Sequence, residues 1–346
     1  MGKRSFIGDI LEQPGVLAEA IRCYPQSAVE ALVPRIQSGE FSRLILAGHG
    51  SSYHALYPAY THLSELPIPV SLWQTAELLH YGMSQIDSNT LICLNSQSGS
   101  SVEVRRLIAS FDDCCPACIV AFTNYTDSPL GDASDITIPL CAGEEHGLAV
   151  KTYLSALSLS ILLSVQLTGG DYDYALENFR VLSHIIGGFL ENWDEKLVEY
   201  NHLIGNPKHI IIVGRGPSMG SASNSALNQK EAAWFFSEGM NAAEFRHGPL
   251  ELADEKLTLF VVEGDEKTRP FNQSLAKEVQ GYGSAVFWIG NHPPQGIQAI
   301  PTPEVAEIFQ PVADIIPMQL ISQVLAARKG KEAGVFRHIG KVVLVE

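Results

Sequence analysis

Short apolar runs alternate with longer amphipathic stretches along the whole chain. Apolar runs of about six residues are typical of buried parallel strands, and longer stretches with apolar positions three or four apart are typical of helices. The apolar runs are residues 43–47, 90–94, 118–123, 135–140, 209–213, 257–262 and 285–289. The helical stretches between them include residues 52–66, 101–111, 151–168, 218–236 and 271–282. This alternation predicts an α/β fold in which helices cover both faces of parallel sheets.

The two halves of the chain repeat one another. The stretch RLILAGHGSS, which begins at Arg43, returns as HIIIVGRGPS at His209, so that Gly48 and Gly214 stand 166 residues apart. The same step carries Leu91 onto Leu257. Two similar α/β domains explain this repeat. We place them at residues 1–190 and 191–346, with the boundary in the helical stretch that follows LTGGDYD.

Composition narrows the classes of partner. The chain has 346 residues, of which 46% are hydrophobic, and this is enough for the cores of two domains of ordinary size. Its net charge of −15 argues against nucleic acid as a partner, because a phosphate backbone needs a basic surface. A small anion can still bind to hydroxyls and to the N–H groups at a helix N-terminus. No apolar run reaches the roughly 18 residues of a membrane span, and no secretory signal precedes the first domain, so we expect a cytoplasmic protein without membrane contact.

The sequence offers no pattern for a metal or a cofactor. Cys115 and Cys118 have the spacing of a metal site, but no second pair completes a zinc tetrahedron, and the histidines lack ligand spacing. Gly48 and Gly50 follow a predicted strand, but Tyr53 stands where a dinucleotide fingerprint needs its third glycine. We therefore predict neither a metal nor a cofactor.

A cluster of hydroxyls follows the strand that contains Leu91. The stretch NSQSGSS, residues 95–101, carries six hydrogen-bonding side chains, and its counterpart in the second half, VVEGDEKTR, has carboxylates instead. Ligands of open α/β sheets bind at the carboxyl ends of strands, between adjacent loops. If the strands of Leu44 and Leu91 are neighbours, their loops converge on one phosphate site, with help from the helix that starts near Ser101. A plain polar turn is the alternative. The predicted ligands are Ser52, Ser96, Gln97, Ser98 and Ser101.

Three residues of the second half and the tail are candidates for proton transfer or substrate contact. Glu231 lies inside an apolar helical run; the helix alone favours a solvated face, while partial burial would raise its pKa and suit a general base. His247 precedes Gly-Pro, which fixes a loop, so it is either exposed or positioned to move protons. Lys341 precedes an apolar tail and is either a surface lysine, as the tail alone favours, or a contact for an anion.

Together these motifs resemble the SIS (sugar isomerase) domain family, in the tandem arrangement found in the isomerase half of glucosamine-6-phosphate synthase and in its freestanding relatives. The resemblance rests on GHGSSY, SQSGSS, GLAVKTY, GRGPS, KEAAWFFSEGMNAAEFRHGPLEL, IPMQLIS and FRHIGKVVLVE. It implies two three-layer αβα domains, a homodimer, and a sugar 6-phosphate on the five predicted ligands together with Gly50, Ser51 and Ala149. It also implies that Glu231 is the base acting between C1 and C2 of the sugar. By the same resemblance His247 of the partner subunit assists ring opening and Lys341 closes over the sugar.

Three departures from the synthase pattern shape the predicted reaction. Asn228 stands where the synthases have a lysine, Val150-Lys151-Thr152 stands where they have Ser-Thr-Lys, and no glutaminase segment precedes the first domain. We therefore expect an enzyme that transfers a proton between C1 and C2 of an amino-sugar or ketosamine 6-phosphate and releases an amine, as a deaminase or deglycase does. A plain aldose–ketose isomerase is the alternative within the same class. A sugar-phosphate sensor without turnover is the alternative of another class.

Overall fold

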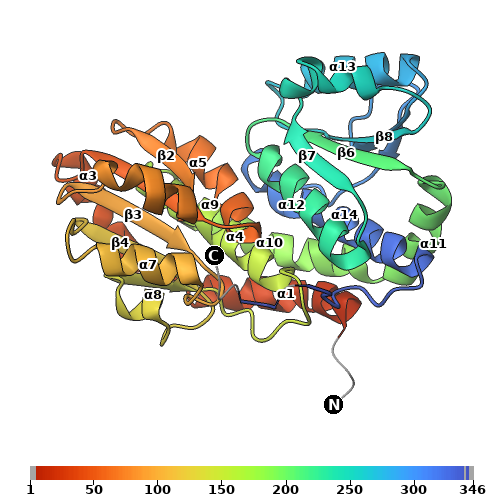
Figure 1. The fold of residues 1–346 in the computed structure, drawn as a ribbon. Coiled ribbons are helices and arrows are strands. Elements are labelled where there is room, and N and C mark those ends of the chain that lie inside the picture. The colour runs from red at the N-terminus through yellow and green to blue at the C-terminus, as the bar shows by residue number, and fades with distance from the viewer. Residues whose placement is uncertain (1–4, 339, 343–346) are drawn as a thin grey trace. The chain divides into compact units, whose positions relative to one another are not determined.

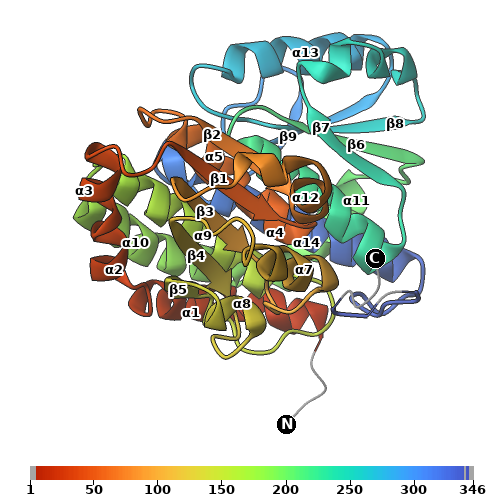
Figure 2. The same ribbon diagram turned by 60° about the vertical axis from the view of Figure 1, so that its left-hand side comes forward.

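A computed structural model describes residues 5–338 and 340–342, and the chain divides into two compact units. Unit 1 comprises Met1–Pro14, Glu145–Val150 and Val181–Phe336. Unit 2 comprises Gly15–Glu144, Lys151–Arg180 and Arg337–Glu346. Each unit is built on a five-stranded parallel sheet with helices on its faces, as Figures 1 and 2 show, so the predicted fold class is confirmed. Whether the chain has independent domains at 1–190 and 191–346 stays a prediction.

The sheet of unit 2 has the strand order β2-β1-β3-β4-β5. Its strands are β1 (Arg43–Gly48), β2 (Val70–Gln74), β3 (Thr90–Asn95), β4 (Cys118–Thr123) and β5 (Ile136–Pro139). Its helices are α2 (Gln26–Glu30), α3 (Leu32–Gln37), α4 (Ser51–Ala55), α5 (Tyr57–Leu63), α6 (Thr75–Glu77), η1 (Leu78–Gly82), η2 (Met83–Gln85), α7 (Val102–Ser110), α8 (Pro129–Asp132) and α9 (Lys151–Leu167). Two helices, α1 (Phe6–Arg22) and α10 (Tyr172–Leu190), contribute residues to both units.

Alternate residues of the central strands of unit 2 pack against α7. Ile45 on β1, Ile92 and Leu94 on β3 are buried in one cluster with Val104 and Leu107 of that helix. This period of two follows from the pleat, which points successive side chains to opposite faces. The helix on this face is the one that follows β3, after the loop Ser96–Ser101.

The sheet of unit 1 has the strand order β10-β9-β8-β6-β7, which matches that of unit 2 element by element when read from the other edge. Its strands are β6 (His209–Gly214), β7 (Ser237–Asn241), β8 (Leu257–Val262), β9 (Ala285–Ile289) and β10 (Gln298–Ile300). Its helices are α11 (Trp193–Leu203), α12 (Ser218–Ala233), η3 (Glu244–Arg246), η4 (Pro249–Leu252), α13 (Arg269–Gly281), η5 (Glu307–Phe309) and α14 (Gln310–Arg328). In Figure 1, α13 covers one face of this sheet and α12 and α14 cover the other.

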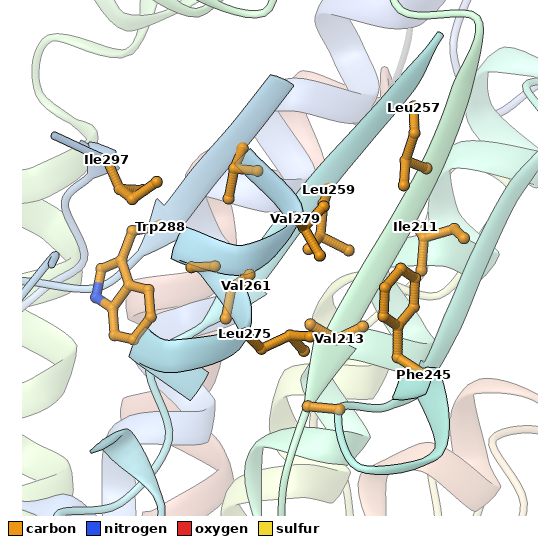
Figure 3. Close-up of a cluster of buried hydrophobic side chains, with 13 residues drawn as sticks. Ile211, Val213, Phe245, Leu257, Leu259, Val261, Leu275, Val279, Trp288 and Ile297 are labelled. Carbon is orange, nitrogen blue, oxygen red and sulfur yellow. The ribbon is translucent and has the colours of Figure 1, made fainter. Parts of the chain in front are cut away.

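The core beneath α13 is shown in Figure 3. Leu259 and Val261 of β8 point toward Leu275 and Val279 of the helix, and Trp288 of β9 closes the cluster. Each of these side chains is almost fully buried. At about 25 cal/mol per Å² of apolar surface removed from water, such clusters supply the main favourable free energy of each unit.

The seven predicted strands all form, within a residue or so of the predicted limits. The repeat is confirmed as well, because β1 and β6 are equivalent strands that begin 166 residues apart. The predicted helix 52–66 is divided into α4 and α5, and the predicted helix 218–236 ends earlier, at Ala233. It ends there because Trp234 adopts a left-handed conformation, with φ of 48°, which a continuing helix does not allow.

Among the described residues, the segment Glu307–Arg328 is long and apolar enough to cross a membrane by length and composition. Within the protein, 83% of its most apolar window is buried, and core helices commonly pass this test. The segment is therefore weak evidence for a membrane span, and the expected lack of membrane contact stays a prediction.

Candidate active site

The two serine loops of unit 2 start at the same edge of the sheet. Strands β1 and β3 are parallel neighbours in which Leu44 pairs with Leu91, as the sequence predicts, and Gly48 pairs with Asn95 at the carboxyl ends. The side-chain amide of Asn95 then donates a hydrogen bond of 2.8 Å to the carbonyl of Ser52. The loop after β1 and the loop after β3 are thus tied together directly.

The loop Ser96–Ser101 is held by its neighbour after β4. The N–H of Asn124 donates to the carbonyl of Gln97 at 3.0 Å. Gly99 has φ of 60°, and a Cβ at that position would lie 2.0 Å from Oγ of Ser128. Only glycine fits both the conformation and the space. Since the backbone is fixed in this way, the loop presents its hydroxyls in one arrangement.

Two of these hydroxyls, on Ser98 and Ser101, lie shortly before α7 in the chain. Oγ of Ser98 accepts from the N–H of Ser100 at 3.3 Å. Ser101 is the N-cap residue of α7, yet its side chain makes no capping hydrogen bond. The first N–H groups of a helix have no partner within the helix, and its N-terminus carries a partial positive charge. The hydroxyl cluster and the start of α7 together can therefore hold a phosphate group.

The loop after β1 leads into α4 without a serine cap. The N-cap of α4 is Gly50, with φ of 51° and no side-chain capping bond. Gly48 also needs to be glycine, because a Cβ there would lie 2.9 Å from the backbone of Ser52. Both serine side chains remain half-buried and are not used for capping.

Glu231 lies in the last turn of α12 in unit 1. The pKa of Glu231 is raised to about 7. Burial is the largest cause and the negative charge of Glu145 the second, while the positive charge of Lys230 acts in the opposite direction. Its Oε2 atom is buried and has no hydrogen-bond partner. The solvated helix face that the helix alone favoured is therefore wrong. A carboxyl group that titrates near neutral pH can both accept and return a proton, as a general base requires.

Glu145 is a residue that the sequence did not single out. It is buried, and its Oε1 accepts a 2.7 Å hydrogen bond from the N–H of Val150. The chain between them turns at Gly147, which has φ of 94° and whose missing Cβ would lie 2.0 Å from the carbonyl of Gly334. In the sequence, residues 144–146 (Glu-Glu-His) show no metal-ligand spacing and no other signal. A buried carboxylate beside a base is a contact made by folding, and periodicity does not reveal it.

The positions that depart from the synthase pattern are both buried. The Asn228 side chain is fully buried on α12. Lys151, at the start of α9, is 3% exposed, and its Nζ donates to the carbonyl of Glu144 at 2.8 Å. This lysine is thus a structural contact within unit 2.

The other candidate residues lie as follows. His247 is exposed, between η3 and η4, with its backbone N–H bonded to the carbonyl of Glu244 at 2.8 Å. Ala149 is half-buried in the segment that also carries Glu145, and Lys341 is exposed. The fold brings the serine cluster together in unit 2, whereas Glu231, Ala149 and His247 belong to unit 1. The roles of His247 and Lys341 stay predictions.

Within the described part of the chain, no group of three or more His, Cys, Asp or Glu residues could hold a metal ion. The serine cluster itself consists of hydroxyl and amide groups, which are poor ligands for transition metals and good donors to phosphate oxygens. The absence of a metal from the reaction remains a prediction.

The chain is similar to known proteins over nearly its whole length. It is 25% identical over 349 residues to glutamine–fructose-6-phosphate aminotransferase (isomerizing) from Thermococcus kodakarensis, covering 98% of this chain and 57% of that protein. The enzyme of the same name from Pyrococcus horikoshii is 28% identical over 352 residues, again with 57% of its length covered. The chain thus spans a little over half of these relatives.

Solved structures show the same fold. The C-terminal domain of glucosamine-fructose-6-phosphate aminotransferase from Francisella tularensis superposes with a TM-score of 0.82 at 21% identity, covering 96% of this chain and 98% of that one. The SIS domain family matches residues 40–165 and 203–328, one match on each sheet. Two matches in tandem account for most of the chain, and the resemblance in the sequence is confirmed. The chain belongs to the SIS domain family.

Proposed function

We propose that this protein transfers a proton between C1 and C2 of an amino-sugar or ketosamine 6-phosphate and releases an amine. The observation that carries the proposal is Glu231, whose pKa is raised to about 7 and whose Oε2 is buried without a partner. An ordinary glutamate, with a pKa near 4.5, is a weaker base and removes a proton from carbon less effectively.

In the proposed reaction, one group of residues binds the phosphate and another residue transfers the proton. The phosphate binds at the loop Ser96–Ser101 and the start of α7, and this remote binding energy holds the open-chain sugar in place. Glu231 removes the proton from the amine-bearing carbon and returns it to the neighbouring carbonyl carbon. The carbonyl oxygen takes up a proton and becomes a hydroxyl, the nitrogen gives up a proton, and the C–N single bond becomes an imine. Water adds to the imine carbon, the amine leaves, and a carbonyl group remains on that carbon.

Relatives support this reaction class. The fold is shared with a solved glucosamine-6-phosphate deaminase from Thermotoga maritima, at a TM-score of 0.77 and 18% identity. We extend the proposal to a homodimer in which His247 of one protomer assists ring opening in its partner, while Lys341 closes over the sugar. We place the enzyme in the cytoplasm, where sugar phosphates are available.

The test is to incubate the protein with glucosamine 6-phosphate, fructose 6-phosphate and a set of fructosamine 6-phosphates, and to follow amine release and ketose formation. Amine release from an amino-sugar or fructosamine phosphate supports the proposal. Interconversion of aldose and ketose without an amine would replace it with the isomerase alternative. Binding of each compound without turnover would replace it with the sensor alternative.

The variant Glu231→Gln tests the role of the base. Because glutamine cannot accept the proton, turnover should fall by roughly 10²–10⁴-fold while the dissociation constant for the sugar phosphate changes little. Since the base must be ionised, kcat/KM of the wild type should fall as the pH drops below about 7. Glu238→Gln, at an exposed position of β7, is the matched control. Unchanged turnover in Glu231→Gln would remove this residue from the mechanism.

A further inference from the structure

Helix α12 carries buried amide side chains without hydrogen-bond partners. Asn224 and Asn228 are both fully buried, and neither the nitrogen nor the oxygen of either side chain has a partner in the described structure. A buried amide without partners destabilises the folded state, because it loses its hydrogen bonds to water. Most buried polar groups in proteins are satisfied, so unpartnered amides on one helix need an explanation.

These amides lie on the same side of α12 as Glu231. Asn228 stands three residues before Glu231, and Asn224 stands seven before it. At about 100° per residue, the three side chains fall within an arc of roughly 60°. Oε2 of Glu231 is also buried and unpartnered, so all three present unused hydrogen-bonding groups along one stripe of the helix.

We propose that the Asn228 amide hydrogen-bonds a hydroxyl group of the substrate's carbon chain, next to the carbon from which Glu231 takes the proton. This inference rests on the proposed function and adds a positioning and specificity-determining residue to it. An amide both donates and accepts, as a hydroxyl does, so the two groups match. Asparagine is also uncharged, and it therefore binds the sugar without adding a charge beside the base.

The same helix supplies a matched control. Gln229 is also fully buried, and both polar atoms of its side chain are unpartnered. It stands two residues before Glu231, about 200° away around the helix, and hence on nearly the opposite side. Asn228 and Gln229 therefore share burial and chemistry, and they differ in whether they lie beside the base.

The experiment compares Asn228→Leu with Gln229→Met. Each change replaces an unpartnered amide by an apolar group of similar size, so both variants should melt at the wild-type temperature or roughly 2–4 °C higher. Asn228→Leu alone should lower kcat/KM by about 10–100-fold and reduce the thermal stabilisation given by the sugar phosphate. The pH at which kcat/KM is half-maximal should stay near that of the wild type, since no charge is changed.

If Asn228→Leu and Gln229→Met bind and turn over substrate equally well, the inference is overturned and the amides serve internal packing only. Should the leucine variant not fold, Asn228→Ala and Gln229→Ala give the same comparison. If the wild type turns over no sugar phosphate, the proposed function fails, and the ligand-induced thermal shift of the two variants still decides the role of Asn228. If no sugar phosphate stabilises the wild type, both proposals fail.

Discussion

The carboxyl ends of β3 and β8 are equivalent places in two sheets of the same topology, yet they hold opposite chemistry. After β3 the loop offers the hydroxyls of Ser96–Ser101. After β8 stand Glu263 and Asp265, and the protein itself satisfies both acids. Glu263 accepts from the Trp288 indole N–H at 2.9 Å, and Asp265 accepts from the N–H of Thr268 at 2.8 Å. The loop after β3 carries hydroxyls, which we propose bind a phosphate, whereas the loop after β8 carries carboxylates that accept hydrogen bonds from the protein itself.

The network around Glu263 explains why such an acid is stable at a sheet edge. Burial by itself would raise the pKa of Glu263, but hydrogen bonds from Trp288 and His292 and the charge of Arg269 outweigh it and lower the pKa. His292 contributes two of these bonds, from its backbone N–H at 2.7 Å and from Nδ1 at 2.6 Å. The loop after β8 therefore carries an internal anion at the place that corresponds to the serine loop after β3. Substitutions in the loop after β3 and in the loop after β8 can each test this comparison.

The largest effect is expected from placing a carboxylate in the serine loop after β3. In Ser98→Asp the new carboxylate can accept from the N–H of Ser100, as the hydroxyl does now, and it repels a phosphate. We expect the protein to fold and its affinity for a sugar phosphate to fall by about 100-fold or more, which calorimetry can measure. Ser84→Asp, at an exposed position of η2, is the control. Retained affinity would show that the phosphate binds elsewhere.

An effect of similar size is expected from removing the internal anion of the loop after β8. Glu263→Gln loses the ion pair with Arg269 and the charge-assisted bonds from His292, and should cost about 2–4 kcal/mol in the free energy of unfolding. Sugar-phosphate affinity should not change. Because folding lowers the pKa of Glu263, its stabilisation is present above its ordinary pKa of 4.5 and is lost as the pH falls through the lowered value.

Denaturant titrations of Glu263→Gln and wild type at pH 7 and pH 3 would measure this difference, with the exposed Glu255→Gln as control. The gap between the two proteins should narrow at the lower pH. A gap of the same size at both values would mean that the charge of Glu263 does not stabilise the fold.

The smallest effect is expected from the glycines that shape the two loops. Gly99 and Gly264 have φ of 60° and 75°, so alanine strains either loop by about 1 kcal/mol. At Gly99 the new Cβ would also collide with Oγ of Ser128, which caps α8 by accepting from the N–H of Gly131. Gly99→Ala should therefore cost about 2 kcal/mol in unfolding experiments, and Gly264→Ala about half of that. Equal losses would show that Ser128 can move without cost.

The sequence predicted the central strands because these are apolar without interruption. It missed β2, β7 and β10, which lie at the edges of the sheets and are largely half-buried or exposed. Edge strands have one unpaired side and need no continuous apolar run, so their sequences look like loops. The end of α12 was misplaced as well, because no pattern in the sequence indicates that Trp234 adopts a left-handed conformation.

The sequence indicated the serine loop of the candidate site, but it did not indicate the raised pKa of Glu231, which depends on burial. A hydroxyl-rich turn after an apolar strand indicates an anion site, and the pairing of Gly48 with Asn95 shows that the loops do meet. The state of Glu231 depends on the surrounding protein and on Glu145, which lies 86 residues earlier in the chain. No local pattern reports such a contact.

Unit 1 is built from separate segments of the chain, and this affects the order in which the protein can fold. Gln13 of α1 is fully buried, and its amide donates to Oε1 of Gln319 on α14 at 2.7 Å, a contact that spans 306 residues. During synthesis α1 must therefore wait until α14 has left the ribosome before this bond can close. A cut at residue 190 would leave the two glutamines on separate polypeptides, so the C-terminal piece should recover its native packing only when a peptide containing α1 is supplied.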